Sequence, residues 1–154
     1  MRTLFIVIML GLAAVLLWRL GPRRKAQRPA LDGPLAGVGD PVTAAAVIMA
    51  AIACEDEAMT ADRQSAYRSL LEAIAGPEQL DAAAEFGRKT ASEIDDAQYV
   101  IDKLGPFLAG KLDDQEKEEL LHMAQEAAMA GGKLPAALTQ RLMRLRQKLG
   151  LEIS

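Results

Sequence analysis

The fold is decided by residues 40–63, DPVTAAAVIMAAIACEDEAMTADR, in which an apolar helix ends at an acidic turn and a second helix begins. Asp40 suits the N-cap of the first helix and Pro41 its first turn, where the missing N–H of proline costs no hydrogen bond. The helix that follows is apolar on almost every side, which is typical of a buried central helix. Thr60 is placed to cap the second helix, with Asp62 in its first turn. We therefore expect a helix–turn–helix unit whose first helix forms the centre of the domain.

A fainter copy of this unit follows about 75 residues later. The alignment sets Ile48 on Met123, Ile52 on Ala127, Ala53 on Ala128, Met59 on Leu134 and Leu70 on Leu145. In the second copy Gly131-Gly132 replaces Asp56-Glu57. The sequence therefore predicts a pseudo-twofold repeat of two helix pairs.

Helical spacing and turn residues place the remaining elements. A third helix is expected from residue 77, after the Gly76-Pro77 stop, to about 90, and a fourth from about 92 to 104. Gly105-Pro106 predicts a break, followed by a short helical turn over 107–110. Asp113 and Glu116 resemble a capping box that opens a helix to about residue 130, and a last helix is expected over 135–149. The prediction is an all-α bundle of about six or seven helices over residues 40–151.

Composition and charge narrow the class of protein. The 154 residues are rich in Ala and Leu, with three Phe, two Tyr and one Trp, which favours helices over strands. Residues 1–40 carry six Lys/Arg against two acids, whereas residues 41–154 carry twelve against nineteen. An acidic domain of this kind is not expected to bind nucleic acid, because such binding depends on neutralising phosphates. Cys54 is the single cysteine, which excludes an internal disulfide and a multi-cysteine zinc site.

The N-terminal segment predicts a membrane anchor over residues 1–21. No charged residue lies between Arg2 and Arg19, and a helix from Thr3 to Leu20 would be about 27 Å long, enough to span a bilayer if the flanking arginines reach the headgroups. A cleaved signal peptide is the alternative, but it should end in small residues. This run instead ends in an aromatic residue and a basic cluster, the residues expected to flank the membrane: Trp18, Arg19, Arg23, Arg24 and Lys25. The positive-inside rule then places the C-terminal domain in the cytoplasm, with the N-terminus outside an inner (cytoplasmic) membrane.

Residues 22–39 are basic at first and then rich in Pro and Gly, with few large apolar residues. This composition predicts a flexible linker between the anchor and the helical domain. The lipid bilayer is accordingly one expected partner of the chain.

Several of these features together resemble the TerB-like domain of tellurite-resistance proteins. They are the Ala-rich helix, the acidic turn, Met59-Thr60 and the distant repeat ending in RLRQKLGL at residues 144–151. The same features are similar to the N-terminal cytosolic region of DjlA-type membrane co-chaperones, although this chain has no J domain with its His-Pro-Asp triplet. The resemblance covers about residues 40–151. It implies an all-helical fold with pseudo-twofold symmetry.

The resemblance also bears on metal binding. The turns of that family usually carry Asp-Gly followed some residues later by Glu, acids that have been taken as metal ligands. Asp56 matches the family Asp, but Glu57 stands in place of Gly and Arg63 in place of the second acid. In the second copy Gly131, Gly132 and Leu138 occupy these positions, so both acids are missing there.

Four acids near the turn form the candidate metal site: Glu55, Asp56, Glu57 and Asp62. Carboxylates that converge on one point suit a divalent cation such as Ca²⁺ or Mg²⁺. Their spacing is not that of an EF-hand loop, and a solvated acidic turn is the alternative. His122 and Cys54 are expected to be, respectively, a helix histidine beside carboxylates and a small core residue.

The last helix carries a basic strip of Arg141, Arg144 and Lys148, at positions i, i+3 and i+7. This strip is a candidate surface for an acidic protein partner or for anionic lipid, and a favourable interaction with the helix dipole is the alternative. The sequence contains no Gly-rich phosphate loop, nucleophile elbow or paired His, so catalysis is not expected.

Two functional hypotheses follow. The first is a membrane-tethered, cytosolic TerB-like interaction module, for which the resemblance implies a role in stress response or tellurite resistance and a protein partner. The second is a divalent metal-ion binding or sensing protein that uses the turn at Asp56.

Overall fold

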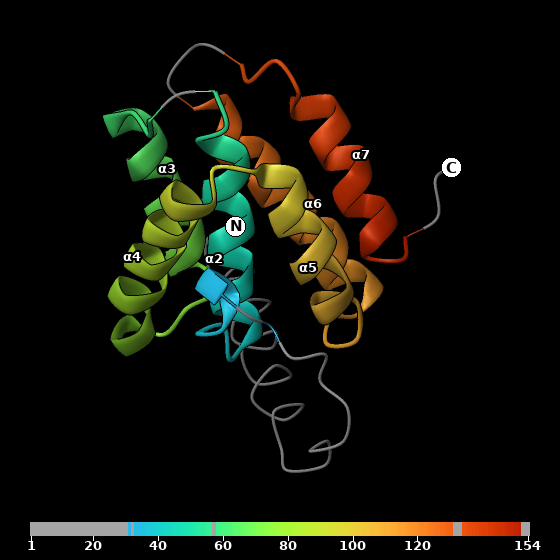
Figure 1. Cartoon of the computed structure of the whole chain (residues 1–154). Coiled ribbons are helices and arrows are strands. Elements are labelled where there is room, and N and C mark those ends of the chain that lie inside the picture. The colour runs from blue at the N-terminus through green and yellow to red at the C-terminus, as the bar shows by residue number, and fades with distance from the viewer. Residues whose placement is uncertain (1–30, 32, 57, 131–133, 152–154) are drawn as a thin grey trace, which may run out of the picture.

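The computed structural model describes residues 31, 33–56, 58–130 and 134–151. These residues form a short 3₁₀ helix, six α-helices and no strand, which confirms the predicted all-α class. The elements are η1 (Gly33–Leu35), α2 (Pro41–Ala53), α3 (Ala61–Glu72), α4 (Pro77–Ile94), α5 (Ala97–Ala109), α6 (Asp114–Met129) and α7 (Leu138–Lys148). Successive helices run in opposite directions, so α2, α4 and α6 begin at one end of the bundle, and α3, α5 and α7 begin at the other (Figure 1).

Helix α2 is the centre of the bundle, as its apolar sequence predicts. Every residue of α2 except Thr43 is buried, and the helix packs against α3, α4, α5 and α6 (Figure 1). Most of its side chains are small, which allows neighbouring backbones to come close. A Cβ added at Gly87 of α4 would lie 2.7 Å from the carbonyl carbon of Ala46 and 2.4 Å from the Tyr67 hydroxyl. Glycine at position 87 therefore sets the close approach of α4 to α2.

The caps expected from the sequence are present. Asp40 Oδ1 accepts a 2.9 Å hydrogen bond from the Thr43 amide, and Thr60 Oγ1 accepts one of 3.2 Å from the Arg63 amide. Asp113 and Glu116 form the reciprocal capping box at the start of α6. These local signals fix the N-termini of α2, α3 and α6.

Three predicted boundaries are wrong. Helix α4 continues to Ile94 and ends at Asp95, which has a left-handed backbone with φ of 50°, and Asp96 caps the next helix. The Gly105-Pro106 pair does not break the chain but lies inside α5. The cost of the proline is offset by packing, because Gly105, Phe107 and Leu108 on that turn are all buried. The last helix begins at Leu138, three residues later than expected.

The predicted linker also ends too late. Leu35 is 1% exposed and Val38 is 7% exposed, and both belong to the hydrophobic core. A Cβ on Gly37 would lie 2.8 Å from the Phe86 ring of α4. Residues 33–39 are therefore part of the helical domain, which begins before the predicted boundary at Asp40.

The predicted membrane anchor, residues 1–21, and its flanking residues Trp18, Arg19, Arg23, Arg24 and Lys25 lie outside the described part of the chain. Among the helices that the structure does describe, none is long and apolar enough to cross a bilayer.

Candidate functional site

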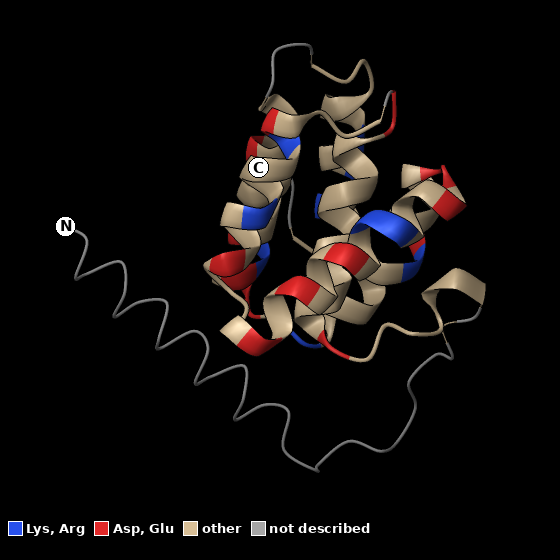
Figure 2. Ribbon diagram, turned by 90° about the vertical axis from the view of Figure 1, so that its left-hand side faces the viewer, with Lys and Arg blue, Asp and Glu red and all other residues tan. Residues whose placement is uncertain are grey.

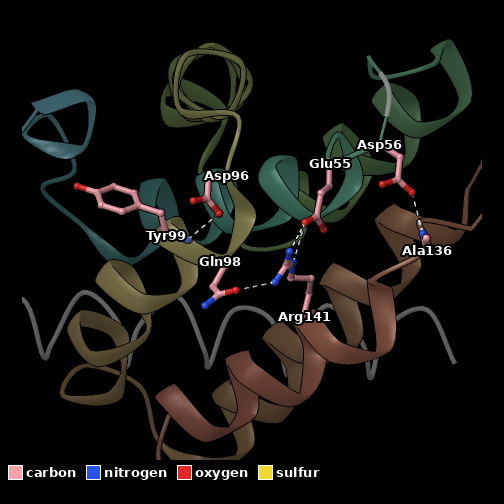
Figure 3. Close-up of polar contacts among 7 residues, drawn as sticks. All are labelled: Glu55, Asp56, Asp96, Gln98, Tyr99, Ala136 and Arg141. Atoms are coloured by element: carbon pink, nitrogen blue, oxygen red, sulfur yellow. Dashed lines mark hydrogen bonds and ion pairs between the residues drawn. The ribbon is translucent and has the colours of Figure 1, made fainter.

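The acidic turn lies where the end of α2 meets α5 and α7. Glu55 Oε1 accepts hydrogen bonds from Arg141 Nε at 2.8 Å and from Arg141 Nη2 at 2.5 Å (Figure 3). The third arm of this guanidinium, Nη1, donates to Gln98 Oε1 at 3.1 Å. The Glu55 and Arg141 side chains are only 15% and 20% exposed, so water screens their ion pair less than one at the surface. The turn is therefore joined to both α5 and α7 through one arginine.

Asp56 accepts a hydrogen bond from the backbone at the N-terminus of α7. Its Oδ2 accepts a 2.7 Å hydrogen bond from the Ala136 amide, two residues before the helix begins (Figure 3). The N-cap of α7, Ala137, has no side chain that can accept a hydrogen bond. Asp56 thus supplies from 80 positions away the negative charge and the acceptor that a local cap would normally provide.

The other two predicted metal ligands are placed differently. Asp62 is exposed in the first turn of α3, where the positive end of the helix dipole stabilises a carboxylate. Glu57 lies outside the described residues. Within the described ranges, no three His, Cys, Asp or Glu side chains are grouped so that they could hold a metal ion. A cation at the turn would compete with Arg141 and Ala136 for Glu55 and Asp56. The metal site stays a prediction, which calorimetric titration with Ca²⁺ against an Asp56→Ala variant would decide.

The predicted basic strip on α7 faces α5. Arg144 donates to both carboxylate oxygens of Asp102, at 2.7 and 2.9 Å, and this contact lowers the pKa of Asp102 below its ordinary value. The hydrogen bond to Glu55 likewise raises the pKa of Arg141. The Lys148 Cβ lies 2.4 Å from the position that a Cβ on Gly105 would take, so α7 lies directly against α5 there. The basic strip therefore helps to hold α7 against α5. The sequence predicted a surface for a partner and did not predict this contact within the domain.

Arg63 is the residue whose role the sequence did not reveal. It is 1% exposed, and its side chain donates to the Ala53 carbonyl at 3.1 Å and to the Ala130 carbonyl at 3.0 Å. These carbonyls end α2 and α6, where backbone acceptors lack partners within the helix and the dipole is negative. One buried guanidinium therefore caps the two helices that the sequence alignment pairs. The available signal was that no glycine follows Ala53 at the end of α2, where the sequence continues with Cys54 and Glu55.

No protein-family model, curated protein or solved structure matches this chain. Charged residues are spread over several helices of the bundle (Figure 2). Around the turn, Glu55, Asp56 and Arg141 join elements that are far apart in the sequence.

Proposed function

We propose that this protein is a membrane-tethered helical domain that acts as a protein-interaction module of the TerB-like type. The observation that carries the proposal is the uncharged apolar run between Arg2 and Arg19, joined to a charged domain with a complete core of its own. A run of this length needs a large apolar environment to leave water. The bilayer supplies one.

The surface of the domain supports this reading. Among the described residues, the exposed large hydrophobic side chains are Tyr99, Met129, Leu134 and Met143. They lie on α5, α6, the segment before α7, and α7 itself. Four such side chains are too few to cover an apolar helix of about five turns. The described surface therefore supports a bilayer, rather than the domain, as the environment of the N-terminal run.

The TerB-like part of the proposal is supported by the repeat. The bounds of α2 and α3, shifted by the roughly 75 positions of the sequence alignment, overlap those of α6 and α7. Ile48 and Ile52 are buried, as are their counterparts Met123 and Ala127. The second turn differs, since Leu134 is 52% exposed whereas Met59 packs partly against the core. We propose the pseudo-twofold architecture on this basis, with stress response or tellurite resistance as the setting that the resemblance suggests.

We propose binding rather than catalysis because of how the charged groups are used. Glu55, Asp56 and Arg141 hold α7 in place, and Arg63 holds two helix ends. Such groups build a stable surface for recognition. A protein partner on the cytoplasmic side is the corresponding expectation.

Membrane fractionation tests the tether. The wild-type chain should remain in a carbonate-washed membrane pellet, and a variant with Ile8→Arg and Leu12→Arg should move to the supernatant, because each central arginine costs about 2.5–3.5 kcal/mol on insertion. The matched control, Ile8→Leu with Leu12→Ile, should stay in the pellet. Recovery of the wild type in the supernatant, or as a chain shortened at its N-terminus, would refute the anchor.

A further inference from the structure

The negative charge of the domain is concentrated on one side of the bundle. Residues 55–96, which include the acidic turn, α3 and α4, contain eleven Asp/Glu and four Lys/Arg, a net charge of −7. Residues 97–154 contain eight Asp/Glu and eight Lys/Arg, so they are neutral overall. Helices α3 and α4 pack against each other along one side of the bundle (Figure 1). That side therefore carries the surplus of negative charge.

The first half of α4 holds a part of this surplus that the fold does not use. Glu78 and Glu85 are exposed, and their separation of seven residues, about two helical turns, places them on one face with the exposed Ala82 between them. We call these three residues the outer face of α4. Neither glutamate makes a hydrogen bond or ion pair with any residue in the described part of the chain. By contrast, Asp81 of the same helix pairs with Arg68 of α3.

The cations of α4 itself do not neutralise the outer face. Arg88 and Lys89 follow Glu85 in the second half of the helix, and among the described residues neither forms an ion pair with it. Glu78 lies ten residues before Arg88, about 15 Å along the helix axis, which exceeds the screening length of physiological salt. The outer face therefore attracts a positively charged group from outside the helix.

The chain carries such a group directly before the domain. Residues 19–28 contain five Lys/Arg and no acid, and four of these cations fall in residues 23–28. The described chain resumes at Leu31, which packs partly against the core, and η1 then contacts α4, with Gly37 against Phe86. At about 3.3–3.6 Å per residue, Arg23 can lie no farther than about 28 Å from Leu31, which is close to the length of α4. The basic segment thus joins the domain beside the helix whose charge it complements.

The spacing of the charges matches as well. The prolines at positions 22 and 29 favour an extended path of about 3.1 Å per residue, which would set Arg24 and Arg28 about 12 Å apart. Glu78 and Glu85 are separated by about 10 Å along the helix axis. One exposed ion pair contributes little alone, but several on one tether act together at an effective concentration on the order of millimolar. A basic segment of another protein would have to compete with this concentration.

We propose that residues 23–28 bind the outer face of α4, with Arg24 and Arg28 beside Glu78 and Glu85. This contact lies within one chain, so it goes beyond the proposed interaction module and depends on neither a partner nor a membrane. It gives a binding role to a segment whose composition predicts only a linker. It also fixes the position of the helical domain relative to the N-terminal run.

A distance measurement on the full chain tests the contact. Spin labels are attached at Ala26→Cys in the segment and Ala82→Cys on the outer face, in a Cys54→Ser background, and pulsed electron paramagnetic resonance measures the distance between them. The chain is kept in zwitterionic detergent micelles, which hold the apolar run in solution whether or not it spans a bilayer. We expect a narrow distribution of short distances at low salt. In about 1 M NaCl, where the screening length falls to about 3 Å, the distribution should lengthen and broaden.

Charge reversal supplies the variants. Glu78→Lys with Glu85→Lys should abolish the short distance, and adding Arg24→Glu with Arg28→Glu to the same chain should restore it. The matched control is Asp114→Lys with Glu126→Lys, which also reverses one first-turn acid and one later exposed acid, but on α6. This control should leave the short distance unchanged.

Several results would overturn the proposal. A long and broad distribution at low salt would show that the segment does not lie on α4, and protection of the label at position 26 by anionic vesicles in that case would assign the cations to lipid. A short distance that survives reversal of Glu78 and Glu85 would remove the ion pairs as its cause. Loss of the short distance in excess unlabelled chain would assign the contact to a second copy. A loss that reversal of Arg24 and Arg28 does not restore would assign it to damage to α4.

Discussion

Arg63 shows how one side chain can complete two helices at once. Its backbone is fixed by the Thr60 cap, and its side chain reaches the carbonyl ends of α2 and α6. It occupies the position where the resemblance implies an acid. A buried positive charge at this point stabilises the same negative helix ends that a bound cation would stabilise.

Replacement of this side chain should be costly. We expect Arg63→Met to lower the free energy of unfolding by about 3 kcal/mol, because the buried Ala53 carbonyl and the partly buried Ala130 carbonyl would both lose their donor. Arg68→Met, which removes an exposed arginine from the same helix, should cost less than about 1 kcal/mol. Denaturant unfolding followed by circular dichroism measures both. Equal losses in the two variants would show that the contacts of Arg63 do not contribute as described.

At the scale of single helices, the sequence predicted what is set locally. The starts of α2, α3 and α6 follow from caps within three residues, and the buried α2 follows from its apolar sequence. The helical path through Pro106 could not be predicted, because it depends on burial of its neighbours against other elements. The contacts of Glu55 with Arg141 and of Asp56 with Ala136 join residues 86 and 80 positions apart, and no local pattern encodes such pairs.

The start of α7 should depend on Asp56. We expect Asp56→Ala to lower stability by about 1 kcal/mol, the usual value of a lost N-cap, and to speed amide hydrogen exchange in the first turn of α7. Asp62→Ala removes an acid of the same turn region that has no such contact, and it should leave exchange in α7 unchanged. Exchange in α7 that is the same in both variants would contradict the capping role.

The docking of α7 on α5 should depend on pH through Asp102. Because Arg144 lowers the pKa of folded Asp102, the pair stabilises the protein above the ordinary carboxyl pKa, and this contribution is lost as the pH falls through the lowered value. Asp102→Asn should therefore melt at a lower temperature than the wild type at neutral pH, and this difference should close as the pH falls below the ordinary carboxyl pKa and through the lowered pKa of Asp102. Arg144→Gln should give the same loss, and the double variant little more. A gap that persists in acid would assign the effect to something other than this ion pair.

At the scale of the whole molecule, the domain begins earlier than its composition suggests. The Pro- and Gly-rich composition of residues 22–39 predicts a linker. However, Leu35 and Val38, which lie among these prolines and glycines, are buried in the hydrophobic core. Two isolated apolar residues carry no periodic signal. Their burial was therefore outside what the sequence pattern could show.

Truncation tests the boundary of the domain. A fragment of residues 31–154 should fold with the stability of the full domain, whereas a fragment of residues 40–154 should lose about 3–5 kcal/mol, since it lacks two buried apolar side chains. Leu35→Ala with Val38→Ala in the longer fragment should reproduce most of that loss. Equal stability of the two fragments would show that the helical domain begins at residue 40.

Because the helices alternate in direction, the bundle has two ends, one where α2 begins, nearer the N-terminal segment, and one at the acidic turn where α2 ends. Residues 33–40 lie at the end where α2 begins, and the acidic turn lies at the other end, one helix of 13 residues or about 20 Å away. With the N-terminal run anchored as proposed, this distance is about twice the screening length of physiological salt. A partner held at the far end would therefore meet the charge of the domain with little influence from the charge of the lipid, so that α2 acts as a spacer as well as a core.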